Sequence, residues 1–226
     1  MRQRYFQVAI DGPAAAGKST VAKITAQKLG FIYIDTGAMY RSLTHKALAC
    51  GVDMHDEQVL KALLDRTVID LCQTAEGQHV FVDGEDVTEQ IRWPEVTANV
   101  SLVSAFRAVR KEMVTRQREL AASRSVVMDG RDIGTHVLPN ADLKIFMKAS
   151  VEERAARRYR EETMKGLHPR LDDLRTAIAV RDRKDSQREV SPLEQAKDAI
   201  ELDTTRLTID EVVNRILELV KERRAQ

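Results

Sequence analysis

The stretch VAIDGPAAAGKSTVAK at residues 8–23 decides the fold. From Gly12 it follows the pattern of a glycine, four residues and then Gly-Lys-Ser, which is typical of a phosphate-binding P-loop. The apolar residues 6–10 before it predict a buried strand, and apolar residues at helical spacing over 18–29 predict a helix that ends at Gly30. The motif needs a strand, a glycine loop and a helix in this order, so the sequence predicts a nucleoside triphosphate site.

Each kind of group in the loop has an expected task. The backbone N–H groups turn inward around the phosphates, Lys18 reaches the β- and γ-phosphates, and the Ser19 hydroxyl is the expected Mg²⁺ ligand. The expected triphosphate-binding residues of the loop are Gly12, Pro13, Ala14, Ala15, Ala16, Gly17, Lys18, Ser19 and Thr20. Because P-loops serve switches, motors and small-molecule kinases alike, the loop leaves the destination of the phosphate open.

Composition bounds the other possibilities. The chain has 226 residues, 43% of them hydrophobic, which suits one domain with its own core. Its formal net charge of +1 argues against a broad nucleic-acid surface. We see no signal-peptide pattern and no run of about eighteen apolar residues, so we expect a cytoplasmic protein with no membrane partner. Cys50 and Cys72 lack ligand spacing, so we expect reduced, mostly buried thiols and no structural zinc.

Later segments extend the first unit into a sheet. Apolar runs predict four more strands, at 31–34, 125–128, 143–147 and 199–202. Thr208 and Glu211 predict a capping box at the start of a closing helix. Strands that alternate with helices predict an α/β fold with a doubly wound, five-stranded parallel sheet.

Two segments depart from this alternation. Residues 68–91 alternate in short strand-like runs around an Asp83-Gly84 turn, which predicts a β-rich insertion, followed by one helix over about 96–122. Over 154–188 arginines outnumber lysines, and the planar guanidinium suits bidentate phosphate contacts. Gly166 and Pro169 interrupt that run, so we expect a lid that closes over a polyphosphate; the alternative is an exposed charged hairpin.

Polar residues follow two of the predicted strands, at the edge where open α/β sheets bind ligands. DTGAMYR places Thr36 and Arg41 there, and we expect both to contact a phosphate. DGRDIGT places Arg131 and Asp132 there, where a site and a local ion pair are equally compatible with the sequence. Asp129, just before them, fits either a water-mediated Mg²⁺ ligand or a turn-stabilising residue, and we leave it unassigned.

Arginines from several segments favour an acceptor that is itself a phosphate. Arg181, Asp185 and Arg188 are spaced i, i+4 and i+7, which predicts a single helix face. No His and Asp constellation resembles a general base, which a hydroxyl acceptor needs and a phosphate with a second pKa of about 6 does not. We therefore expect a nucleoside monophosphate as the acceptor, with a lid that excludes water.

In combination and order, the motifs resemble bacterial cytidylate kinases over essentially the whole chain. They are IDGPAAAGKST, DTGAMYR, the β-rich insertion, DGRDIGT, RDRKDSQR and DTT. Adenylate and thymidylate kinases share the first motif but lack the long insertion and GRDIGT. The resemblance implies a P-loop nucleoside monophosphate kinase fold and transfer of phosphate from ATP to CMP or dCMP with Mg²⁺, giving ADP and CDP or dCDP.

The resemblance also implies roles for single residues. Around the CMP phosphate it places Thr36, Arg41, Arg131 and Arg188; facing cytosine, Ser101, Arg110 and Asp132; near the ribose, Arg181 and Asp185. The expected catalytic charges are Lys18, Arg131, Arg181 and Arg188, and the lid residues expected at ATP are Arg157 and Arg158. A carboxylate suits the base assignment, because cytosine offers an N4 amino donor where uracil has an acceptor.

The implied organisation is one kinase domain in three parts. They are a core at 1–37, 104–153 and 190–226, a monophosphate-binding insertion at 38–103 and an arginine-rich lid at 154–189. We expect a monomer, because one chain contains the loop, the acceptor site and the lid. The alternatives are a kinase for another small acceptor, such as UMP or a hydroxyl compound, and a GTPase-like switch, although no Asn-Lys-x-Asp run occurs.

Overall fold

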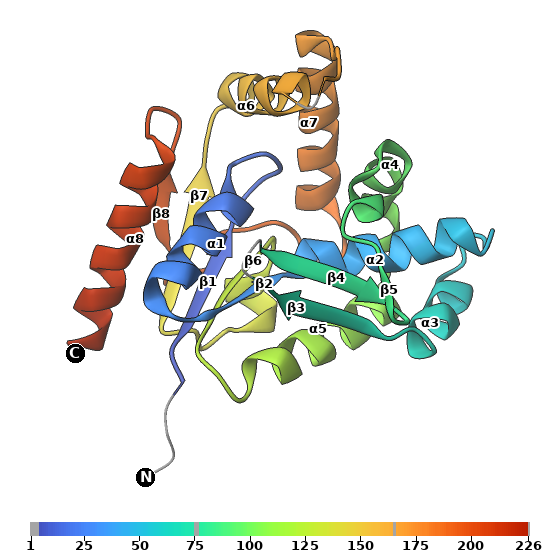
Figure 1. Cartoon of the computed structure of the whole chain (residues 1–226), viewed down its shortest axis with the longest axis horizontal. Coiled ribbons are helices and arrows are strands. Elements are labelled where there is room, and N and C mark those ends of the chain that lie inside the picture. The colour runs from blue at the N-terminus through green and yellow to red at the C-terminus, as the bar shows by residue number, and fades with distance from the viewer. Residues whose placement is uncertain (1–4, 75–76, 165, 226) are drawn as a thin grey trace.

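The computed structural model describes residues 5–74, 77–164 and 166–225. Within these ranges a five-stranded sheet has all its strand pairs parallel, with helices on both faces (Figure 1). Its order is β2 (Ile32–Asp35), β6 (Val126–Gly130), β1 (Gln7–Asp11), β7 (Leu143–Lys148) and β8 (Ile200–Asp203). The predicted doubly wound α/β fold is confirmed.

Strand β1 lies at the centre of the sheet and contributes to both hydrophobic layers. Val8 and Ile10 point to the face covered by α1 (Lys18–Leu29) and α8 (Ile209–Arg224), while Ala9 points to the other face. This alternation is the period of two that a strand imposes on its side chains. The chain leaves β1 between β6 and β7, where the strand order reverses and open α/β sheets bind ligands.

A second unit is formed by the part of the chain that runs from the end of β2 to the start of β6. The helices α2 (Thr36–Ala49), α3 (Glu57–Asp65), α4 (Pro94–Val103) and α5 (Arg107–Ala121) share a core that includes Leu43, Leu60, Val103 and Met113. Beside them, β3 (Ile69–Gln73), β4 (Gln78–Val82) and β5 (Glu85–Asp86) form an antiparallel sheet, followed by the short helix η1 (Gln90–Arg92). The turn between β4 and β5 falls at Asp83-Gly84, as the sequence indicates.

The single helix predicted over about 96–122 is wrong, because α4 ends at Val103 and α5 begins at Arg107. The buried residues explain the break: Val103 and Val109 are six positions apart, a spacing that does not keep them on one helix face. Phe106 takes an extended conformation between the two helices and packs against the same core.

The expectation of buried thiols is also wrong. Cys50 and Cys72 are free and exposed. Cys50 follows the last turn of α2, and Cys72 lies on the exposed side of the alternating strand β3. Neither position is part of the apolar pattern of its element, so the general tendency of cysteine to be buried does not decide its place here.

Along the chain, two helices follow β7 and precede β8: α6 (Val151–Met164) and α7 (Leu171–Gln187), which pack against each other. They stand above the carboxyl ends of the strands (Figure 1). Arg188 follows the end of α7 in extended conformation. The prediction that Arg181, Asp185 and Arg188 share one helix face is therefore wrong.

In the described part of the chain, no helix combines the length and the apolar character needed to cross a membrane.

The closing helix α8 begins with the predicted capping box. Thr208 accepts the Glu211 N–H through its hydroxyl, and the Glu211 carboxylate accepts the Thr208 N–H at 2.8 Å. We expect Thr208→Ala to lower the free energy of unfolding by about 1 kcal/mol, which lowers Tm by about 2–4 °C in a domain of this size.

Calorimetry of Thr208→Ala beside Thr115→Ala checks this effect. Thr115 lies exposed within α5, where its hydroxyl bonds back to the Lys111 carbonyl, so its replacement by the better helix former alanine should leave Tm unchanged or slightly raised. Equal Tm values for the two variants would contradict the capping contribution.

Candidate active site

The loop after β1 turns sharply because Gly12 has no side chain. Its φ is 149°, and a Cβ at this position would lie 2.2 Å from the Met147 carbonyl oxygen of β7. Gly17 then takes a left-handed conformation as the N-cap of α1. The loop therefore runs against the sheet and presents its backbone at the start of a helix, which is the geometry that binds phosphate.

Lys18 lies buried inside this loop. Its Nζ donates to the carbonyl oxygen of Pro13 at 2.7 Å. Burial, and then the positive charge of Arg131, lower the pKa of Lys18 from 10.5 to about 7, and Arg181 acts in the same direction. Burial and two nearby guanidinium groups thus disfavour the charged form of Lys18, which an anionic ligand would favour.

Asp129, on β6, is hydrogen-bonded to Ser19 at the start of α1. Ser19 Oγ donates to Asp129 Oδ2 and the Tyr33 hydroxyl donates to Oδ1, each at 2.9 Å. Burial, and then the charge of Asp35, raise the pKa of Asp129 to about 6. A hydroxyl beside a carboxylate is a donor pair that fits Mg²⁺, which usually takes one or two carboxylates plus substrate phosphates. No group of three or more His, Cys, Asp or Glu suited to a metal occurs in the described ranges.

Ion pairs join three segments at the same edge of the sheet. The Arg110 guanidinium of α5 donates to the Asp132 carboxylate, and Arg188 Nη2 lies 3.6 Å from the other oxygen of Asp132. Arg131 Nε donates to Asp185 Oδ2 of α7 at 2.9 Å. The predicted residues of the turn, of α5 and of the α7 end are therefore brought together in space.

The break between α4 and α5 helps to place Arg110. Arg110 Nη1 donates to the Ser104 carbonyl in that break at 3.1 Å, and its guanidinium lies 5.5 Å from the ring centre of Tyr40. Contacts to a carbonyl, a ring and a carboxylate fix a long side chain in one rotamer. Ser101, on α4, is partly buried one turn before the break.

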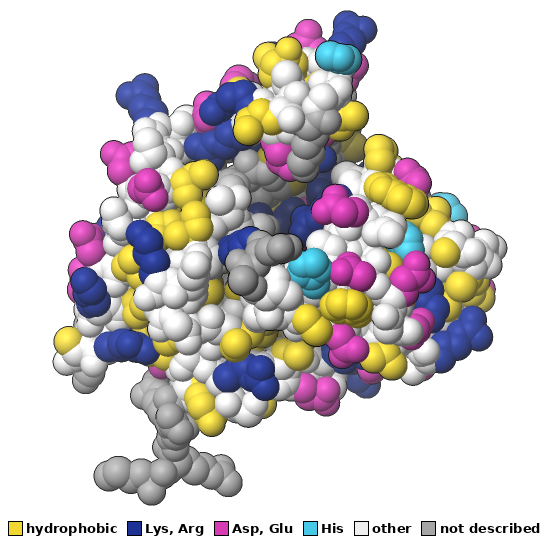
Figure 2. All heavy atoms as spheres, in the orientation of Figure 1, with side chains coloured by type: hydrophobic (Ala, Val, Ile, Leu, Met, Phe, Trp, Pro, Cys, Tyr) yellow, Lys and Arg dark blue, Asp and Glu magenta, His cyan; other side chains and the backbone are white. Residues whose placement is uncertain are grey.

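Three buried arginine nitrogens in this cluster have no hydrogen-bond partner among the described residues. They are Arg110 Nε, Arg181 Nε and Arg188 Nη2. Buried polar atoms are almost always hydrogen-bonded, and each unsatisfied one is costly. Donors of this kind, gathered beside a phosphate-binding loop, fit a second polar or anionic ligand. Lys and Arg side chains are seen within the hollow below the α6 and α7 helices (Figure 2).

Thr36 opens α2 directly after the carboxyl end of β2, and Arg41 lies in the second turn of the same helix. Thr36 Oγ1 donates to the Asp129 carbonyl at 2.7 Å, and Arg41 Nη1 donates to Thr97 Oγ1 at 2.8 Å. Burial, and then the charge of Arg181, lower the pKa of Arg41 to about 9. Arg41 and Arg181 therefore share one positively charged region.

Only part of the arginine run faces the loop. Arg157 Nη1 donates to the Ala16 carbonyl at 3.3 Å, and Arg158 is half-buried and pairs with Glu162. The exposed arginines of the run are Arg160, Arg170, Arg175 and Arg183.

Arg154 belongs to the same run, but its guanidinium binds other groups of the protein. It is buried, and its Nη1 donates to the Ala14 carbonyl at 3.0 Å and to Asp182 Oδ2 at 2.5 Å. Asp182 also accepts the Ala14 N–H at 3.2 Å. The pair ties both helices of the hairpin to the loop, a role that the sequence analysis missed because charge spacing does not show which helix face packs.

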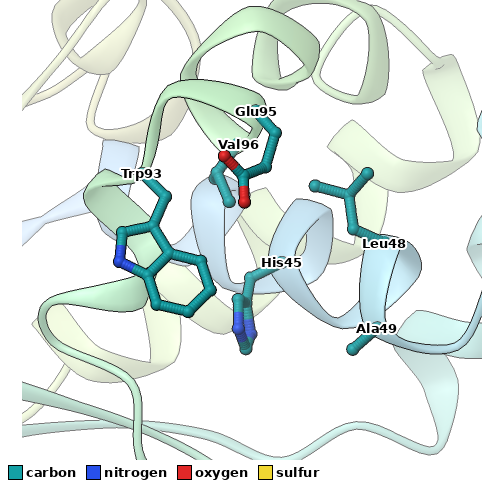
Figure 3. Close-up of a pocket in the computed structure, with 6 residues that line it drawn as sticks. All are labelled: His45, Leu48, Ala49, Trp93, Glu95 and Val96. Carbon is teal, nitrogen blue, oxygen red and sulfur yellow. The ribbon is translucent and has the colours of Figure 1, made fainter.

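A separate cavity lies between α2 and the start of α4 (Figure 3). Its lining consists of His45, Leu48, Ala49, Trp93, Glu95 and Val96. This lining is mostly apolar and contains no Lys or Arg, so it does not suit a phosphate.

A P-loop with a buried lysine, facing a cluster of arginines at the carboxyl edge of a parallel sheet, defines a P-loop phosphotransferase. The family model described as "Cytidylate kinase" matches residues 8–222. The cytidylate kinase of Geobacillus kaustophilus (strain HTA426) is 60% identical over 221 residues, covering 98% of this chain and 99% of that protein. The cytidylate kinase of Bacillus subtilis (strain 168) is 58% identical with the same coverage. The chain belongs to the cytidylate kinase family.

The electrostatics of Lys18 give a direct prediction. Replacing Arg131 by Met removes a positive charge that lowers the pKa of Lys18, so that pKa should rise above about 7. Nuclear magnetic resonance of labelled lysine side chains, followed against pH, measures it. Arg118→Met is the control, because Arg118 donates to the His136 and Val137 carbonyls and is not among the main charges that shift the pKa of Lys18. The same Lys18 pKa in both variants would show that Arg131 does not act on it.

Proposed function

We propose that the protein transfers the γ-phosphoryl group of ATP to CMP or dCMP, giving ADP and CDP or dCDP. The observation that carries the proposal is the set of buried arginine nitrogens that lack a hydrogen-bond partner among the described residues, at the sheet edge that carries the P-loop. They fit a second anionic substrate next to a triphosphate, and membership of the cytidylate kinase family supports the choice of that substrate. The enzyme is then a nucleoside monophosphate phosphotransferase.

The donor half of the site is the loop and the start of α1. The backbone N–H groups of the loop, where Pro13 offers none, would surround the phosphates, and Lys18 would approach the transferred group. Ser19 and Asp129 would hold Mg²⁺, whose charge neutralises the phosphate oxygens when bound. Arg157, which already contacts the loop, and Arg158 lie on α6, from where they would add positive charge at ATP.

The acceptor half holds the phosphate of CMP. The proposed contacts of this phosphate are Thr36 and Arg41 of α2, Arg131 in the turn after β6, and Arg188 in the chain after α7. A phosphate acceptor is mostly ionised at neutral pH, so transfer needs positioning and charge stabilisation more than a base. We propose that the developing charge is stabilised by Lys18, Arg131, Arg181 and Arg188.

Base recognition depends on Asp132 and Arg110. Arg110 holds the Asp132 carboxylate, which leaves acceptor capacity for the N4 amino group of cytosine, and the Arg110 guanidinium serves O2 and N3. Uracil places an acceptor where cytosine has that amino group, so the carboxylate would repel it. Ser101 on α4 is the third proposed base contact.

Closure completes the site. Arg181 and Asp185 of α7 are proposed to contact the ribose, and the hairpin of α6 and α7 to form the lid within 154–189. A closed lid keeps water from taking the phosphoryl group.

We further propose that the domain has the core and insertion boundaries given above and acts as a monomer. Its proposed place is the pyrimidine nucleotide metabolism of the cytoplasm, where ATP and nucleoside monophosphates occur.

A substrate panel tests the function. The purified protein should release ADP from ATP and Mg²⁺ with CMP and dCMP, and much less with UMP, AMP, dTMP or shikimate. Preference for another acceptor would show that the protein is a kinase but that the proposed cytosine pocket is wrong. Release without any acceptor would favour the switch-like alternative.

The base pocket has its own test. Asp132→Asn should lower kcat/KM for CMP by roughly tenfold to a hundredfold and narrow the preference for CMP over UMP, because the amide offers a donor where a carboxylate only accepts. Asp70→Asn, an exposed change on β3, should alter neither value. An unchanged CMP to UMP ratio in Asp132→Asn would exclude Asp132 as the base-reading residue.

A further inference from the structure

Asp11 ends β1 directly before the P-loop, yet its carboxylate is hydrogen-bonded to the chain that follows β6. It is 4% exposed, and its two oxygens accept one backbone N–H each. Oδ1 accepts the Ile133 N–H at 2.8 Å and Oδ2 accepts the Gly134 N–H at 2.7 Å. Neither the loop motif nor the contacts proposed above involve this side chain.

The two N–H groups open the short helix η2 (Ile133–Val137), which follows Asp132. The first N–H groups of a helix lack partners within it, and an aspartate in the N-cap position normally accepts one of them through its own side chain. Asp132 is the N-cap of η2 but makes no such bond. Its carboxylate is instead directed to Arg110 and Arg188.

We propose that Asp11 is a positioning residue that caps η2 in place of Asp132 and thereby leaves the Asp132 carboxylate free to recognise the acceptor base. This inference rests on the proposed function. Because β1 continues into the P-loop, the same residue fixes the distance between the donor loop and the turn that carries Arg131 and Asp132.

The surroundings of Asp11 fit this role. A Cβ on Gly134 would lie 3.3 Å from Asp11 Oδ2 and 3.1 Å from Lys144 Cδ, so the absence of a side chain lets the carboxylate reach both N–H groups. Burial raises the pKa of Asp11 to about 7, while the two N–H bonds lower it. Burying a carboxylate is unfavourable, and here the cost is offset because the carboxylate satisfies the Ile133 and Gly134 N–H groups.

The test compares Asp11→Asn with Asp142→Asn. Asp142 likewise accepts a backbone N–H of β1, that of Gln7 at 2.8 Å, but at the opposite edge of the sheet. At about pH 8, where Asp11 is ionised, the CMP affinity of Asp11→Asn should fall about tenfold or more by calorimetry, with a clearly smaller change in ATP affinity, because the charge of Asp11 also acts on Lys18. Its ratio of kcat/KM for CMP over UMP should fall as well, because Asp132 turns back to cap its own helix. Asp142→Asn should keep the affinities and the ratio.

Equal losses of ATP and CMP affinity would overturn the proposal in favour of simple support of the loop. An unchanged CMP affinity in a folded Asp11→Asn would overturn it as well.

Amide hydrogen exchange separates this inference from the proposed function, because it needs no substrate. In the wild-type protein the Ile133 and Gly134 amides should exchange slowly, and in Asp11→Asn at least one should exchange about tenfold faster or more. If the wild type does not bind CMP but shows this exchange pattern, the proposed function fails while the capping by Asp11 stands. Fast exchange of both amides in the wild type overturns the capping even if Asp11→Asn does not fold.

Discussion

The site depends on the parallel pairing of β1 with β6. Ile10 pairs with Asp129 and Asp11 with Gly130, so the loop after one strand and the turn after the other leave the sheet side by side. Residues more than a hundred positions apart, such as Ser19 and Asp129, come within hydrogen-bond distance for this reason. A slip of one residue in that pairing would turn the side chains of a strand to the opposite face and separate these groups.

Carboxylates keep the arginines in place. Asp132 faces Arg110 and Arg188, Asp185 holds Arg131, and Asp182 holds Arg154. A cluster of arginines alone would be pushed apart by its own charge and would lose side-chain freedom on binding. Because acidic partners fix the guanidinium groups beforehand, less of the binding free energy is spent on ordering them. Buried pairs of this kind add little net stability by themselves, so their main effect is on geometry.

The sequence predicts the local parts of this structure well and the long-range parts poorly. The loop, the five strands, the Asp83-Gly84 turn and the Thr208 capping box depend on neighbouring residues, and all are present. The division between α4 and α5 was missed, because apolar residues continue through it and only their phase changes. Asp129 followed an apolar strand, which was a signal, but its contact with Ser19 needs the strand order.

The arginine run shows the same limit. Composition indicates phosphate binding somewhere in 154–188, yet it does not distinguish Arg154, which is buried against the loop backbone, from the exposed Arg160. That distinction requires knowing which helix face packs.

The break at 104–106 has a consequence for how this protein can change in evolution. Ser104 supports Arg110 through its main-chain carbonyl, and any residue provides that oxygen. Selection on the proposed base contact of Arg110 then acts here mainly on the path of the chain. Ser104 is buried and its hydroxyl donates to the Ser101 carbonyl at 3.3 Å, so small residues that preserve the bend should be tolerated, whereas an insertion or deletion in 104–106 should be eliminated. A position can thus be functional through its main chain, with its side chain limited by the space around it.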